Sequence, residues 1–173
     1  MNRYRALSFL ACCALLGLTG AAQAPQASLA TTSTTSRDAS IRSRLLGNWK
    51  LVSYVTFDAN GGTRPGNYDV GRVAYDASGE MTAHLMNSKR PVANPTTDAA
   101  RGEAYSTYLA YFGPFTVDEQ KGTVTHHVLG SSYPHWAGSD QVRYYAFSAD
   151  GRLTLSVKAG ERVSGSLVWE RIE

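Results

Sequence analysis

The sequence has only two cysteines, a formal net charge of just +3 and no hydrophobic run as long as a membrane-spanning helix. Cys12 and Cys13 both lie inside the N-terminal apolar run Ala6–Leu18. This run is shorter than the about 20 residues that cross a bilayer. We therefore expect no transmembrane helix in the mature chain. A lipoprotein anchor is less favoured than a cleaved leader, because these cysteines sit within the apolar run and not at its end.

The N-terminus has the features of a secretory signal peptide. Arg3 and Arg5 precede the apolar run, and the small-x-small triplet at 22–24 follows it. We predict that Met1–Ala24 is cleaved after Ala24 and that the protein is periplasmic or secreted. The mature chain would then contain no thiol, disulfide or cysteine–metal site. Losing two of the 17 basic residues leaves 15 against 14 acidic ones, a net charge of +1, which argues against a nucleic-acid partner.

The segment at 25–40 is rich in Ala, Ser and Thr and almost free of large apolar residues. Such a composition buries too little surface to offset the entropy of ordering, so a flexible tether is predicted. Residues 41–173 then suit one domain with one core.

Within this domain the patterns predict an all-β fold with one inserted helix. The helix is expected at 97–112, because apolar residues follow helical spacing after Thr97, a plausible N-cap, until Gly113 and Pro114. We expect it to pack at an end of the fold. Short strands with tight turns favour a sandwich or a closed barrel. The expected strands are Gly47–Phe57, Gly71–Tyr75, Glu80–Asn87, Phe115–Asp118, Thr123–Leu129, Gln141–Phe147, Arg152–Lys158 and Gly165–Ile172.

Several motifs together resemble the bacterial and fungal lipocalin-like domain family of the calycin superfamily. Gly47-Asn48-Trp49 matches the G-x-W signature at the start of the first strand. Other matching stretches are Val73–Ala83, Tyr108–Asp118, 122–128 and Leu167–Arg171. The resemblance implies an eight-stranded antiparallel barrel. It also implies that Trp49 closes one end, with Arg171 stacked over its indole, so that Gly47, Trp49 and Arg171 are structural residues.

Period-two alternation sorts side chains between the lumen and the outside. If Trp49 faces the lumen, Ser53 shares its face. The family pattern places further candidate ligand contacts inward: Tyr75, Met81, His126, Arg143 and Tyr145.

His126 and His127 are adjacent in one expected strand, so only one of them can face the lumen. We assign His126 inward, either as a polar ligand contact or as a hydrogen-bonded core residue. Arg143 offers a planar fork of donors suited to a carboxylate or enolate. Arg143 would otherwise form an internal ion pair with Asp140 or Glu170, or contact loop carbonyls, and have no role in ligand binding.

Other kinds of chemistry find little support. The four histidines show no metal-ligand spacing, so no metal is predicted. No nucleophile elbow and no phosphate-binding glycine motif is present, and no cofactor is expected. Trp136, in the loop 134–136, is expected either to gate a ligand at the open end or to pack on the helix.

The leading functional hypothesis is an exported protein that binds a small hydrophobic or amphipathic molecule in its barrel. One alternative is a cyclase or isomerase with His126 as acid/base and Arg143 as anion stabiliser. A second alternative is an envelope protein whose barrel is filled by its own side chains. Whether the protein is an enzyme stays open, as do the ligand and the oligomeric state.

Overall fold

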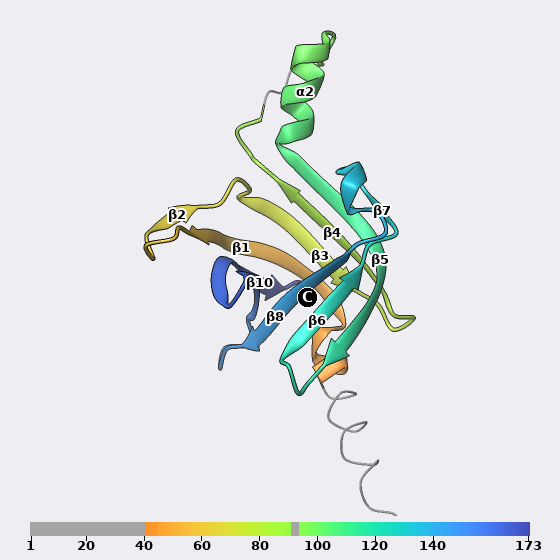
Figure 1. Ribbon diagram of the computed structural model, residues 1–173. Helices are drawn as coiled ribbons and strands as arrows, with labels where there is room; N and C mark the ends of the chain where they lie inside the picture. Colours follow the sequence, from red (N-terminus) through yellow and green to blue (C-terminus); the bar gives the residue numbers. More distant parts are fainter. Residues whose placement is uncertain (1–40, 91–93) are drawn as a thin grey trace, which may run out of the picture. The chain divides into compact units, whose positions relative to one another are not determined.

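A computed structural model describes residues 41–90 and 94–173 of the chain (Figure 1). The predicted signal peptide and tether lie outside the described residues. The described part begins with a helical stretch at 41–45 and contains ten strands, one α-helix and one short 3₁₀ helix after it. In chain order these are β1 (Gly47–Phe57), β2 (Thr63–Pro65), β3 (Val70–Tyr75), β4 (Glu80–Met86), α2 (Asp98–Ser106), β5 (Tyr108–Asp118), β6 (Thr123–His127), β7 (Gly130–Ser131), η1 (Pro134–Trp136), β8 (Asp140–Phe147), β9 (Leu153–Ala159) and β10 (Arg162–Arg171).

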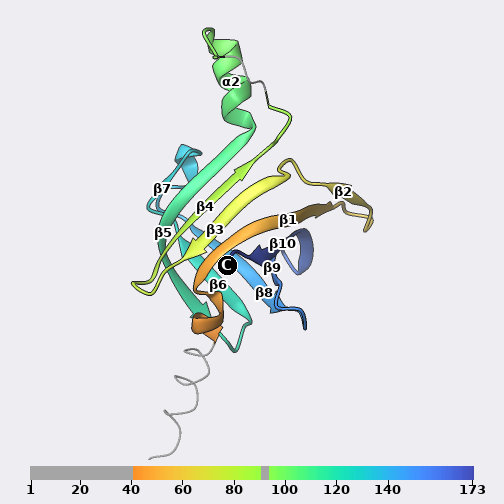
Figure 2. The same cartoon turned by 180° about the vertical axis from the view of Figure 1, so that it is seen from behind.

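Eight of the strands close into an antiparallel barrel, as the sequence predicted. The sheet runs β10-β9-β8-β6-β5-β4-β3-β1, and β10 also pairs with β1 to complete the ring. This closing ladder extends from Trp49↔Arg171 to Thr56↔Gly165. The short strands β2 and β7 pair outside the ring, with β1 and β5 respectively. Figure 2 shows β1, β3 and β4 side by side across one wall, with β8 and β9 behind them.

The first strand carries an irregularity that changes which side chains face the lumen. The β1–β10 register shifts between Leu51 and Ser53, so Leu51 pairs with Trp169 but Ser53 pairs with Val168. A bulge of this kind inserts one extra residue and reverses the alternation beyond it. Ser53 is therefore exposed, and Tyr54 takes the inward position. The expectation that Ser53 shares the face of Trp49 is corrected by this bulge.

One end of the barrel is closed by the contact that the family resemblance implies. The guanidinium carbon of Arg171 lies 4.1 Å from the ring centroid of Trp49, and the indole Nε1 donates to the Leu45 carbonyl at 2.8 Å. The two terminal nitrogens of Arg171 also donate to the carbonyls of Leu46 and Arg44, at 2.5 and 2.7 Å. Gly47 permits this arrangement, because a Cβ there would lie 2.6 Å from Arg171 Nη1.

The helix is shorter than the sequence suggested. Thr97 is its N-cap and accepts a hydrogen bond from Ala100 N, but α2 ends at Ser106. The following stretch is strand β5, in which Leu109, Tyr111 and Phe115 are buried at every second or fourth position.

The predicted helix range 97–112 is therefore wrong at its C-terminal end. Tyr108, Leu109 and Phe112 fit a helical period as well as an alternating one, and the pairing of β5 with β4 and β6 decides between the two. The helix itself extends from the barrel end, and none of its residues is buried (Figure 1). No helix among the described residues is long and apolar enough to cross a membrane.

Candidate functional site

The lumen is filled near Trp49 and hollow toward the end that carries α2. Tyr75, Met81, Phe115 and Leu153, all buried, fill the closed half. Beyond them lies a cavity of about 220 Å³. Residues from all eight strands of the ring and from the η1 turn line it. Its walls are mostly apolar and include Val73, Ala83, Leu85, Leu109, Leu155, Val157 and Leu167. Its polar and aromatic lining consists of Tyr54, Tyr68, Tyr111, His126, Trp136, Gln141, Arg143, Ser164 and Trp169.

His126 lies in the wall of this cavity, between two tyrosine hydroxyls. Its Nε2 is 2.7 Å from the Tyr75 hydroxyl, and its Nδ1 is 3.0 Å from the Tyr111 hydroxyl. The side chain is 1% exposed, so both ring nitrogens have protein partners in a place that water barely reaches. Burial lowers the pKa of His126 well below its usual value, and the nearby positive charge of Arg143 lowers it further. The ring is therefore neutral at physiological pH.

The two tyrosines are held in the neutral phenol form by the same burial. Burial raises the pKa of Tyr75 well above its usual value, and the proximity of Tyr111 adds to the effect. Burial also raises the pKa of Tyr111, while the charge of Arg143 and its interaction with the hydroxyl oppose that rise. Tyr75, His126 and Tyr111 thus form a neutral hydrogen-bonded chain that leads from the filled half of the lumen to the cavity.

Arg143 comes from β8 and reaches the cavity without an acidic partner among the described residues. Its Nη1 donates to the Val142 carbonyl at 3.0 Å, and its Nη2 makes a long contact of 3.4 Å with Gln141 Oε1. The two acidic residues considered as partners are engaged elsewhere. Asp140 contacts His127 at 2.7 Å, and Glu170 pairs with Lys50 at 3.1 Å.

Aromatic side chains surround the cavity at the end near α2. Tyr54 and Tyr68 stack with centroids 6.4 Å apart, and the Tyr68 hydroxyl lies 2.9 Å from that of Tyr133. Burial raises the pKa of Tyr68. Trp136 packs edge-on against Tyr111, with centroids 5.5 Å apart. Trp136 thus contacts strand β5 at the cavity.

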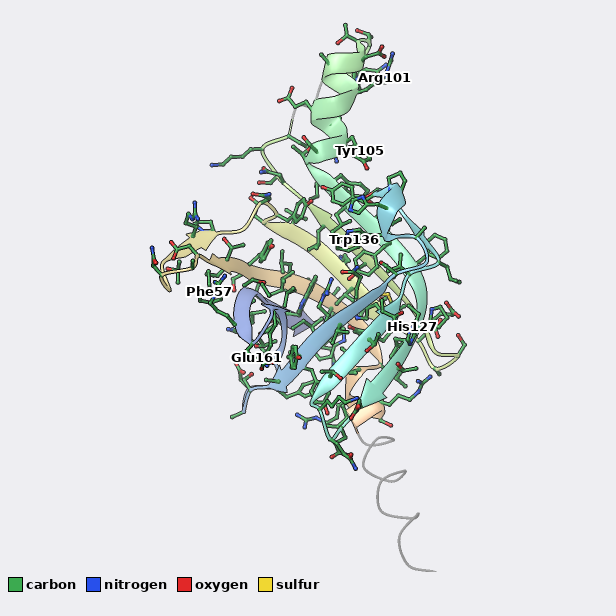
Figure 3. The ribbon with its side chains drawn as sticks, in the orientation of Figure 1. Phe57, Arg101, Tyr105, His127, Trp136 and Glu161 are labelled. Carbon is green, nitrogen blue, oxygen red and sulfur yellow. The ribbon has the colours of Figure 1, made fainter. Side chains whose placement is uncertain are left out.

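Tyr133, in the same loop as Trp136, contacts the helix. Its ring lies 5.4 Å from that of Tyr105, at the end of α2 that adjoins the barrel (Figure 3). The loop Tyr133–Trp136 therefore links the helix to the cavity wall.

Of the seven predicted ligand contacts, three line the cavity: His126, Arg143 and Trp136. Tyr75 and Met81 face inward but lie in the filled half, 2% exposed. Tyr145 is partly buried, packs near Phe147 with centroids 6.3 Å apart, and is not among the residues that line the cavity. The height of these inward side chains along the barrel axis depends on how neighbouring strands are staggered. The alternation along one strand does not reveal that stagger.

Most of the other cavity residues were not predicted as ligand contacts, and three of them show why. Tyr111 was assigned to the helix, although the alternation of Leu109, Tyr111, Gly113 and Phe115 could have placed it on an inward strand face. Tyr54 faces inward only because of the β1 bulge, which leaves no local sequence signal. Trp169 enters the sequence analysis only as part of the family stretch Leu167–Arg171, without a side assigned to it. Its Nε1 is buried without a hydrogen-bond partner among the described residues.

His127 faces away from the lumen, as the alternation required. Its two ring nitrogens contact Thr116 and Asp140, at 2.9 and 2.7 Å, on the outer surface of β6 (Figure 3). Within 41–90 and 94–173, no group of three or more His, Cys, Asp or Glu side chains is placed to hold a metal ion.

These features define the molecule as a closed eight-stranded barrel with an apolar cavity and a small polar group on its wall. A family model for the lipocalin-like domain matches residues 46–172, and the chain belongs to that family. A search of curated proteins gave no match. Among solved structures, a redesigned β-barrel is similar at 11% identity over 76% of this chain and 95% of its own, with a TM-score of 0.40.

Proposed function

We propose that this protein is an exported binding protein that holds one small, mostly apolar molecule in its barrel. The observation that carries the proposal is the cavity of about 220 Å³, which interrupts an otherwise packed lumen. Ligand sites commonly combine apolar walls with a few polar groups that orient the ligand. The cavity is somewhat smaller than the roughly 300–1,000 Å³ of typical sites, which favours a compact ligand. It also argues against a barrel filled completely by its own side chains.

Export is supported by the residues before the domain. The basic start, the apolar run and the small-x-small triplet at 22–24 together indicate a cleaved leader. Intact mass measurement of the protein made in its own host should give a chain that begins at Pro25. A full-length mass, or a mass with an added lipid, would contradict this part of the proposal.

Ligand binding can be tested on the same preparation by native mass spectrometry without detergent. We expect a discrete added mass, or binding of the neutral apolar fluorophore N-phenylnaphthylamine if the natural ligand is lost. A clean ligand-free mass together with no fluorescence enhancement would overturn the binding proposal.

A second candidate function is an isomerase or cyclase, and one observation favours it. Arg143 lies beside the Tyr111 hydroxyl without an acidic partner in the described part of the chain, and such a pair suits stabilisation of a developing oxyanion. His126 would then orient Tyr111, because hydrogen bonds occupy both of its ring nitrogens. Turnover of an added carbonyl substrate, lost in Arg143→Met, would favour the enzyme over the carrier.

A further inference from the structure

We propose that the cavity selects compact apolar molecules that carry a carboxylate, and that Arg143 and the Tyr111 hydroxyl bind that group. This inference rests on the proposed binding function and names the chemical class of the ligand. It follows from the direction of the hydrogen bonds around His126 and from the charges on the cavity wall.

The hydrogen-bond chain has one arrangement that satisfies every buried group. The Tyr75 hydroxyl is buried, and its one hydrogen bond among the described residues is to His126 Nε2. If Nε2 carried the ring proton, the Tyr75 proton would have no acceptor, a costly state for a buried donor. Tyr75 therefore donates to Nε2, and the proton of the neutral ring lies on Nδ1.

This arrangement determines what Tyr111 presents to the cavity. The Nδ1–H of His126 donates to the Tyr111 oxygen, 3.0 Å away. The Tyr111 oxygen thus acts as an acceptor toward His126, and its own proton is available to a ligand. Tyr111 lines the cavity, so the chain from Tyr75 supplies a hydrogen-bond donor at the cavity surface.

Arg143 provides a positive charge at the same place. Its guanidinium has five N–H groups. Two make the contacts to Val142 and Gln141 already described, and another interacts with the Tyr111 oxygen, which leaves N–H groups for a ligand. Arg143, Tyr111 and His126 all line this one cavity. The charge of Arg143 accordingly lowers the pKa of His126 and opposes the rise in the pKa of Tyr111. No Asp or Glu is among the residues that line the cavity.

The cavity thus has one cationic group, an adjacent neutral donor and no negative charge to balance them. A carboxylate complements this set, because a guanidinium and a hydroxyl donate to its oxygens while the apolar walls cover the rest of the molecule. The volume of about 220 Å³ limits the body to a compact group such as one aromatic ring with a short chain.

The test compares two probes that share a shape and differ in charge, trans-cinnamate and cinnamamide. Isothermal titration calorimetry of the mature protein at pH 7.5 should show cinnamate binding at least about tenfold more tightly than the amide. In Arg143→Met the ratio should fall to about one through weaker cinnamate binding, because the guanidinium accounts for the preference. Arg72→Met, an exposed arginine on β3, is the matched control and should keep the wild-type ratio.

Two tyrosine variants test the direction of the hydrogen-bond chain and remain informative if Arg143→Met does not fold. Tyr111→Phe removes the donor and should weaken cinnamate binding severalfold. Tyr75→Phe leaves the cavity lining intact and removes the donor to His126 Nε2, so the Nδ1–H tautomer loses the bond that favours it. We expect a smaller loss for cinnamate than in Tyr111→Phe. ¹⁵N NMR of the unmodified protein should show the ring proton on Nδ1, and a proton on Nε2 would overturn the proposed direction of the hydrogen-bond chain.

The outcomes separate this inference from the proposed function. Equal binding of cinnamate and cinnamamide, or a preference for cinnamate that survives in Arg143→Met, would overturn the carboxylate assignment. If N-phenylnaphthylamine binds but cinnamate does not, the assignment also fails while the binding function stands. If none of the three probes binds and the native mass is free of ligand, both proposals fail.

Discussion

His126 and His127 are neighbours in the chain and have opposite surroundings. His126 is enclosed between two tyrosines and 1% exposed, whereas the side chain of His127 is 37% exposed and contacts Asp140. The difference follows from the alternation of a strand, which turns successive side chains to opposite faces. Because His126 is buried with its partners, its two hydrogen bonds affect both stability and any ligand that reaches Tyr111.

Replacing Tyr75 by Phe should destabilise the protein by about 1–3 kcal/mol, because it leaves the buried Nε2 of His126 without a partner. Tyr105→Phe is the control, since Tyr105 is 47% exposed and its ring contact with Tyr133 survives the change. Urea unfolding monitored by circular dichroism measures both. Equal stability of the two variants would show that the Tyr75–His126 bond contributes little.

The low pKa of His126 predicts a pH dependence of stability. Above pH about 6.5 the ring is neutral in both the folded and the unfolded chain, so its contribution is fully present. As the pH falls below about 6.5, the unfolded chain takes up a proton that the folded protein does not. The free energy of unfolding should therefore fall by up to about 1.4 kcal/mol per pH unit, until the folded-state pKa is reached.

Urea unfolding between pH 7 and pH 5 measures this slope. The His126→Gln variant, though less stable, should lose the part of this pH dependence that comes from His126. The His135→Gln variant, changed in the exposed loop, should keep it. A wild-type slope that persists in His126→Gln would assign the pH dependence to another group.

At the scale of the element, strand β5 combines a glycine, a proline and a helical-looking sequence, yet it forms eleven residues of strand. Gly113 explains part of this. A Cβ at this position would clash with the carbonyl oxygen of His127 and lie 2.9 Å from Leu129 N. Both atoms are backbone atoms, one in the last residue of β6 and one just after that strand. They cannot move away as the end of a flexible side chain can.

Gly113→Ala should therefore lower the free energy of unfolding by about 1–3 kcal/mol. Gly102→Ala is the opposite case, since Gly102 lies within α2 and has open space around it. That change should stabilise the protein by up to about 1 kcal/mol, if the helix contributes to the folding transition. Thermal unfolding of both variants checks the pair, and a neutral Gly113→Ala would show that β5 and β6 can separate at this point.

At the scale of the whole molecule, the barrel depends on the contact between its first and last strands. Arg171 contributes to this contact twice, through the Trp49 indole and through the carbonyls of Arg44 and Leu46. The carbonyl bonds also hold the stretch at 41–46 against the closed end.

Arg171→Met should cost about 1–3 kcal/mol of stability, since it removes a cation–π contact and two charged hydrogen bonds. Binding of N-phenylnaphthylamine should be nearly unchanged, because the closed end lies away from the cavity. Arg72→Met again serves as the control. A large loss of binding with little loss of stability would place Arg171 in the ligand site.

The sequence by itself determined the barrel, most strand positions, the Thr97 cap and the opposite faces of His126 and His127. These features depend on local periodicity, on turn residues and on the family motifs around Trp49, all of which a single chain displays. The tertiary structure decided where β5 begins, that Tyr54 and not Ser53 faces inward, and which inward residues surround a cavity. Those outcomes depend on the β1 bulge, on strand stagger and on contacts between residues far apart in sequence, which local patterns do not contain.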